Sequence, residues 1–157
     1  MKIGEEFKEH EIILNGSSEP FSKRMERMLK VITDSIPEEG AKAWDTTKNE
    51  ETTVSKEELL KMHFHVESVN NFPTASGVAS SSSGLSCLAL CLSKVYGCNM
   101  SLEEVSRLAR LGSGSASRSL FGGFVLWDKG FDDDVKDADL NSKAIQVKSE
   151  EHWPDLC

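Results

Sequence analysis

The residues best suited to chemistry are a run of small and hydroxyl side chains at positions 70–86. The run reads N-N-F-P-T-A-S-G-V-A-S-S-S-S-G-L-S. It follows an alternating segment at 62–66, which predicts a half-buried strand, and precedes apolar residues at helical spacing over 85–95. A loop of small residues that leads into a helix could bind an anion. The first N–H groups of a helix have no partner within it, and they lie at the positive end of the helix dipole.

A plainer interpretation of this run stays open. A stretch rich in Ser and Gly is also typical of a flexible linker or of an ordinary helix cap. The run is not a Walker-type loop, because G-x-x-x-x-G-K-[ST] is absent, and no G-x-G-x-x-G follows a strand. Composition alone therefore does not decide between a phosphate site and a linker.

A second run of small residues adds a more specific pattern. Residues 108–125 read L-A-R-L-G-S-G-S-A-S-R-S-L-F-G-G-F-V. This run resembles the R-Q-G-S-G-S-A-C-R-S-L-[FY]-G-G-[FY]-V motif of the diphosphomevalonate decarboxylases. The run at 70–84 resembles the phosphate-binding loop of the same family, which is part of the GHMP kinase superfamily. The first run alone would indicate only the superfamily, whereas the pair in this order indicates the family.

The resemblance implies a fold and a reaction. The fold is α+β, part of the ribosomal protein S5 domain 2-like fold, with a mixed sheet and helices on one face. The family converts mevalonate 5-diphosphate and ATP into isopentenyl diphosphate, ADP, phosphate and carbon dioxide, and Mg²⁺ accompanies ATP. Two polyphosphates must then lie close together, and fixed donors must stabilise the charge on the transferred group.

The motif match also implies contacts for individual residues. Arg118 would hold the substrate carboxylate, a role that suits its planar pair of donors, and Ser113 and Ser115 would contact the substrate diphosphate. Without the resemblance, Arg118 would be one basic residue among 18, expected in a surface ion pair. The ATP phosphates would lie on the 73–83 loop, with contacts from Pro73, Gly77, Ala79, Ser80, Ser81 and Ser82.

The chain also departs from the family pattern. Leu111 stands where the family has Gln, and Ser117 replaces the usual Cys. The loop has further changes at Ser76, Val78, Ser82 and Ser83, where Ala, Leu, Ala and Ala are usual. The family's active-site lysine and catalytic aspartate have no matching position. We therefore expect an internal or truncated fragment that lacks the first strands and the C-terminal domain and turns over little substrate alone.

Two other functions stay open beside the decarboxylase. One is another GHMP small-molecule kinase, against which the motif at 112–118 argues. The other is a non-catalytic module that binds nucleotide or a protein partner. Family members are commonly homodimers, so a homodimer is possible here.

Composition narrows the class of partner. The chain has 157 residues and a formal net charge of −8, which argues against nucleic acid or an anionic membrane as the main partner. No apolar run is long enough to span a bilayer, and the N-terminus lacks the apolar core of a secretory signal. We expect a cytosolic protein with a single partial domain over 1–157.

Three groups of residues raise the question of a metal. Cys87 and Cys91 would share one helix face, but no Cys/His quartet completes a site, so buried reduced cysteines are the favoured interpretation. His63 and His65 would point to one side of a strand without an evident third ligand. The aspartates at 132–134 lie in an acidic loop at 128–142 and are expected to be solvated. No metal ligand is assigned.

Local signals predict the remaining elements. Asn15-Gly16 indicates a tight turn after a short strand at 11–14. Apolar spacing predicts a helix over 21–36, capped by Ser22 and stopped by Pro37. The segment 37–53 has many charges and few large apolar groups, so we expect a mobile surface insertion. Further helices should start at capping boxes over 55–58 and 101–104, Gly97 should end the helix at 85–95, and strands should cover 62–69, 122–127 and 144–147.

Overall fold

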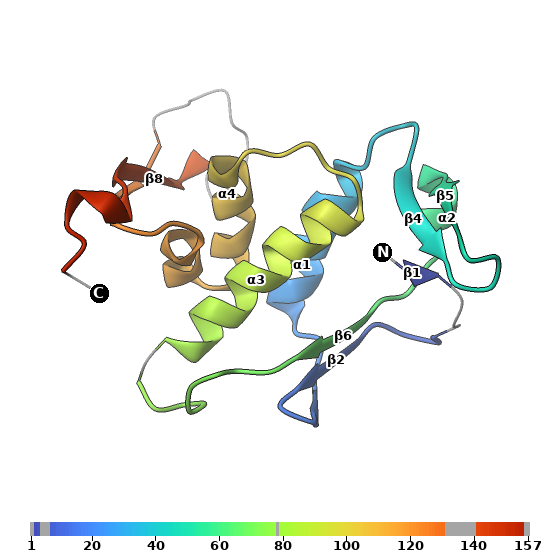
Figure 1. Ribbon diagram of the computed structural model, residues 1–157, viewed down its shortest axis with the longest axis horizontal. Coiled ribbons are helices and arrows are strands. Elements are labelled where there is room, and N and C mark those ends of the chain that lie inside the picture. Colours follow the sequence, from blue (N-terminus) through green and yellow to red (C-terminus); the bar gives the residue numbers. More distant parts are fainter. Residues whose placement is uncertain (1, 4–6, 78, 131–140, 156–157) are drawn as a thin grey trace. The chain divides into compact units, whose positions relative to one another are not determined.

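The computed structural model describes residues 2–3, 7–77, 79–130 and 141–155 (Figure 1). The chain divides into two compact units, one made of 1–74 and 92–99 and the other of 75–91 and 100–157. Both units combine helices with short strands, so the predicted α+β class is confirmed. Val78, Cys157 and the aspartates at 132–134 lie outside the described residues, as does most of the predicted acidic loop. A single domain over 1–157 stays a prediction.

One sheet of the first unit forms around a tight hairpin. β2 (Glu11–Leu14) pairs antiparallel with β3 (Ser17–Glu19) and parallel with β6 (His65–Ser68). The hairpin turn is made by Asn15 and Gly16, whose φ angles of 50° and 80° give the left-handed pair that a two-residue turn favours. The turn predicted from Asn-Gly is confirmed. β6 begins three residues later than predicted from position 62, because its pairing with β2 starts at His65 opposite Glu11.

A second sheet of this unit contains the segment for which the sequence predicts a surface insertion. β4 (Ala41–Asp45) pairs parallel with β1 (Lys2–Ile3) and antiparallel with β5 (Glu50–Val54). The small side chains of Ala41 and Ala43 alternate with exposed ones and are buried, so the segment contributes to the core. Composition did not predict this hairpin because alanines carry the buried face. The predicted mobility of 37–53 stays a prediction.

Two capped helices belong to the same unit. α1 (Lys23–Asp34) begins at Ser22, whose hydroxyl accepts a hydrogen bond from the Met25 N–H at 3.3 Å, and buries Met28, Leu29 and Ile32. α2 (Lys56–Leu59) begins with a complete capping box between Ser55 and Glu58. The predicted caps are therefore confirmed.

The second unit joins helices to a two-stranded sheet. α4 (Leu102–Gly112) is followed by the 3₁₀ helix η1 (Gly114–Leu120) and by the antiparallel strands β7 (Phe124–Asp128) and β8 (Lys143–Lys148). The sheet packs on α4 through Ala144, which is fully buried and donates its N–H to Ser106 Oγ at 2.9 Å. Mixed pairing is present as predicted, but the strands of the described residues form three small sheets. A further 3₁₀ turn, η2, covers Glu150–His152.

The long helix α3 (Ser80–Val95) contributes residues to both units. It begins five residues before the apolar spacing predicts, because its first turn consists of serines and carries no apolar signal. It ends as predicted at Gly97, which has φ of 70°. A Cβ added there would lie 3.0 Å from Ala41 Cβ, so both conformation and space favour glycine. None of the helices in the described part of the chain is both long and apolar enough to cross a membrane.

Candidate functional site

The loop before α3 has an unusual backbone. Ala75, Gly77 and Ala79 all have positive φ, at 57°, 82° and 59°. The two alanines occupy a region that L-residues rarely adopt, at a cost on the order of 1 kcal/mol each. A Cβ added to Gly77 would meet nothing within 4 Å, so the space beside it is open. The Ala75 N–H donates to Ser80 Oγ at 3.3 Å, which ties the loop to the first residue of the helix.

The first turn of α3 contains backbone donors that precede the hydrogen bonds of the helix. Ser83 N–H donates to the Ala79 carbonyl at 3.1 Å, so the N–H groups of Ser80, Ser81 and Ser82 precede the first bond of the helix. No acidic residue lies in this turn, and the Ser81 side chain is exposed. Backbone N–H groups, the exposed Ser81 side chain and the positive end of the helix dipole therefore lie in a turn that has no acidic residue.

Two hydroxyls join this turn to the second motif. Ser82, which is only 3% exposed, forms a hydrogen bond through its Oγ with Ser115 Oγ. Ser113 Oγ lies 3.4 Å from Ser115 Oγ, which extends the chain of hydroxyls. Ser82, assigned to ATP, and Ser115, assigned to the substrate diphosphate, are therefore neighbours within one unit, although they are far apart in the sequence.

Ser86 is a residue of this site that the sequence analysis did not identify. Its Oγ lies 2.7 Å from the Ser82 carbonyl oxygen and 2.6 Å from the Ala116 carbonyl oxygen, and the side chain is buried. Its position four residues after Ser82 on a helix, beside Leu85 and Leu88, is the signal that could have indicated a buried polar contact. A Cβ on Gly112 would lie 3.1 Å from Leu85 Cδ2, so this glycine allows α4 to approach α3 closely.

Arg118 occupies an exposed position on η1. Within the part of the chain that the structure describes, it forms no ion pair, so its guanidinium is available to an anion. Its neighbour Ser117 is buried and donates to the Gly114 carbonyl at 3.0 Å, which fixes the turn from which Arg118 projects. Pro73 belongs to the other unit, in which the Asn15 side chain donates to Thr74 Oγ1 at 3.0 Å.

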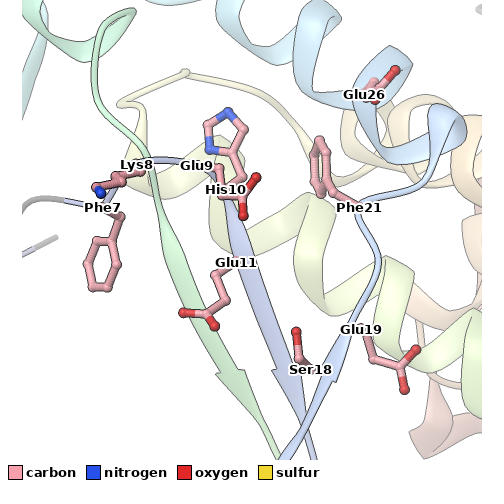
Figure 2. A pocket seen from close by; sticks show the side chains of 9 residues that line it. All are labelled: Phe7, Lys8, Glu9, His10, Glu11, Ser18, Glu19, Phe21 and Glu26. Atoms are coloured by element: carbon pink, nitrogen blue, oxygen red, sulfur yellow. The ribbon is translucent and has the colours of Figure 1, made fainter.

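One pocket of the described residues is lined largely by carboxylates. It has a volume of about 610 Å³ and lies in the first unit, beside β2 and β3 (Figure 2). The glutamates at positions 9, 11, 19 and 26 line it, together with His10 and the rings of Phe7 and Phe21. Four carboxylates would repel a polyphosphate, so this pocket is not the candidate site.

The histidines are held by neighbouring side chains. His65 Nδ1 lies 2.8 Å from Glu11 and its Nε2 lies 3.2 Å from Glu67. Hydrogen bonds to Glu67 and then Glu11 raise the pKa of His65. The ring of His63 lies 5.0 Å from that of His10, and partial burial followed by His63 lowers the pKa of His10. The described residues contain no group of three or more His, Cys, Asp or Glu placed to hold a metal ion.

Comparisons with known proteins match nearly the whole chain. The family model described as "Diphosphomevalonate decarboxylase-like N-terminal domain" matches residues 1–154. The diphosphomevalonate decarboxylase of Rattus norvegicus is 43% identical over 155 residues, which cover 98% of this chain and 35% of that protein.

Solved structures agree with these sequence matches. The mevalonate diphosphate decarboxylase from Trypanosoma brucei is 36% identical with a TM-score of 0.69, over 94% of this chain and 33% of that chain. A solved structure described as "MDDEF in complex with MVAPP, AMPPCP and Magnesium" is 33% identical with a TM-score of 0.59. The match covers 90% of this chain and 36% of that chain. The chain thus spans 33–36% of the length of these three proteins.

Proposed function

Because the chain belongs to the family of diphosphomevalonate decarboxylase-like N-terminal domains, we propose that its second unit holds the phosphates of ATP and of mevalonate 5-diphosphate. The activity proposed for the whole protein is the ATP-dependent decarboxylation of mevalonate 5-diphosphate to isopentenyl diphosphate. The proposal assigns this chain the positioning of both substrates.

The hydrogen bond between Ser82 Oγ and Ser115 Oγ carries the proposal. It fixes the first turn of α3 beside the first turn of η1. Phosphoryl transfer is catalysed largely by positioning, so a site must hold donor and acceptor in adjacent places. Two loops of small residues that share a hydroxyl contact meet that need.

The start of α3 is proposed to bind the ATP phosphates. The open space beside Gly77 would let phosphate oxygens approach the backbone, and the N–H groups of Ser80, Ser81 and Ser82 would donate to them. ATP would supply the phosphoryl group. Mg²⁺ would bind together with ATP. No described residue is assigned as a ligand of the ion. In the similar MDDEF structure, an ATP analogue and magnesium are present together with MVAPP.

Arg118 is proposed to hold the substrate carboxylate, and Ser113 and Ser115 its diphosphate. An exposed guanidinium without an ion pair to a described residue offers two parallel donors to a carboxylate. Such a pair orients the group that leaves as carbon dioxide. The hydroxyls of Ser113 and Ser115 already lie within 3.4 Å of one another and would turn toward diphosphate oxygens.

The test is a calorimetric titration of the chain with mevalonate 5-diphosphate in the presence of Mg²⁺ and a non-hydrolysable ATP analogue. We expect Arg118→Gln to weaken binding by about tenfold or more, since a charge-assisted pair contributes about 1.5–3 kcal/mol. Arg24→Gln, which removes another exposed arginine, should leave binding unchanged. Equal effects of the two variants would contradict the assignment of Arg118.

Product analysis separates this reaction from that of another small-molecule kinase of the superfamily. Release of carbon dioxide from labelled mevalonate 5-diphosphate identifies a decarboxylase, whereas a phosphorylated product without carbon dioxide identifies a kinase.

The homodimer and the cytosolic location stay predictions. Light scattering of the purified chain measures its oligomeric state.

A further inference from the structure

A pair of thiols lies on α3 apart from the proposed phosphate contacts. Cys87 and Cys91 are both exposed, and their Sγ atoms are 3.9 Å apart. They are separated by one helical turn, so both side chains lie on one face of the helix. The third described cysteine, Cys98, is buried, and its Sγ lies 3.5 Å from the Ile32 carbonyl oxygen.

The spacing of these thiols fits one ligand better than it fits a disulfide. Residues four apart on a helix have Cβ atoms about 5–6 Å apart, whereas a disulfide needs about 3.5–4.5 Å. A disulfide would therefore require the helix to distort. Two thiolates on one tetrahedral ion with bonds of about 2.3 Å are about 3.8 Å apart. The distance of 3.9 Å between the two Sγ atoms matches that separation.

We propose that Cys87 and Cys91 form a bidentate site for a soft divalent cation such as Zn²⁺ or Cd²⁺. Thiolate ligands select soft metal ions over Mg²⁺ and Ca²⁺, so this site is chemically separate from any ion that accompanies a nucleotide. Solvent fills the remaining coordination positions. The inference does not rest on the function proposed above.

The binding step releases protons. Cysteine binds a metal ion as the thiolate, so each S–H gives up its proton on binding. Partial burial, and then the neighbouring Cys87, raise the pKa of the Cys91 thiol. Two S–H bonds break, two bonds from sulfur to the metal form, and two protons pass to solvent. No electron is transferred.

The experiment uses Cd²⁺ and the full chain in a Cys157→Ser background. We expect one Cd²⁺ per chain, a thiolate-to-cadmium absorption band, and the release of two protons. Mass spectrometry after alkylation should show Cys87 and Cys91 protected together. Cys87→Ser and Cys91→Ser should each weaken Cd²⁺ binding at least tenfold, whereas Cys98→Ser should not change it.

Several outcomes would overturn the proposal. They are unchanged Cd²⁺ affinity in either exposed-cysteine variant, protection of one thiol without the other, or a requirement for Cys98. Since both thiols are exposed, their replacement by Ser should leave the helix intact, which circular dichroism verifies. MgATP binding in the same variants should stay unchanged if the two sites are independent.

Discussion

The first turns of α3 and α4 lie in the same unit and differ in what occupies their backbone donors. At α4, Ser101 Oγ accepts from the Glu104 N–H at 3.3 Å, and the Glu104 carboxylate accepts from the Ser101 N–H at 2.7 Å. Glu103 adds a second carboxylate to that turn. At α3, left-handed residues precede the helix and no acidic side chain is present in the first turn. At α4 the donors of the first turn bind the helix's own carboxylate, whereas the first turn of α3 has no acidic residue.

The difference bears on whether an external anion could bind at each helix start. A carboxylate at a helix start binds the N–H groups that a phosphate would need, and it repels the phosphate charge. Hydrogen bonds from the Ser101 N–H and then from its hydroxyl lower the pKa of Glu104, so this carboxylate stays ionised. The first turn of α3 has no carboxylate of its own to compensate the helix dipole.

The largest effect on stability should come from breaking the contact between α3 and η1. Ser86→Ala removes the hydroxyl that lies between the Ser82 and Ala116 carbonyls, and we expect a loss of about 1–3 kcal/mol in the free energy of unfolding. Ser83→Ala changes an exposed serine of the same helix and should stay within about 0.5 kcal/mol. Urea denaturation measures both. Equal losses would mean that the buried hydroxyl does not hold the two loops together.

A smaller loss of stability should follow when the capping box at the start of α4 is removed. Ser101→Ala removes the side-chain half of the capping box and should cost about 1 kcal/mol of stability. MgATP affinity should not change, because the proposed nucleotide contacts are on α3. A variant that lost nucleotide affinity in parallel with stability would show that the two helix starts are not independent.

The smallest expected effect is the loss of stability at acid pH that comes from Asp45, another carboxylate that accepts hydrogen bonds from neighbouring residues. Asp45 accepts hydrogen bonds from the Thr47 hydroxyl at 2.6 Å and from the Lys48 N–H at 3.2 Å, and these contacts lower its pKa to about 2. Its pKa in the unfolded chain is higher, at about 3.9. The stabilisation is therefore fully present above about pH 4 and is lost as the pH falls toward 2.

Acid titration tests this assignment. Asp45→Asn should remove the part of the acid-induced loss of stability that falls between about pH 4 and pH 2. Carboxyl chemical shifts followed by NMR give the pKa directly. A midpoint near the ordinary value for aspartate would contradict the hydrogen-bonded turn.

Helix caps and tight turns were predictable from the sequence because the residues that form them are close together in the chain. The caps at Ser22, Ser55 and Ser101 and the turn at Asn15-Gly16 involve residues at most a few positions apart. The family resemblance assigned the two serine-rich runs to two ligands that must lie close together, and these assignments stay predictions. It did not indicate the hydroxyl contact between Ser82 and Ser115.

Contacts that depend on partners distant in the sequence were not predictable. Ala41 and Ala43 form a buried strand face only because β1 and β5 flank them. The role of Ser86 depends on a carbonyl of Ala116 that lies thirty positions away in the chain. The start of α3 was also misplaced, because serines in a first turn do not have the apolar spacing by which a helix is recognised.

The most direct test of nucleotide binding at the start of α3 is the affinity of the full chain for MgATP, measured by calorimetry with and without a carboxylate at Ser81. An aspartate in a first turn is favourable for the helix, so Ser81→Asp should fold normally while it repels phosphate. The account predicts that Ser81→Asp weakens MgATP binding by about tenfold or more and that the neutral Ser81→Asn stays within about threefold of the unmodified chain. Equal MgATP affinities in all three proteins would contradict the proposal that α3 binds the nucleotide phosphates.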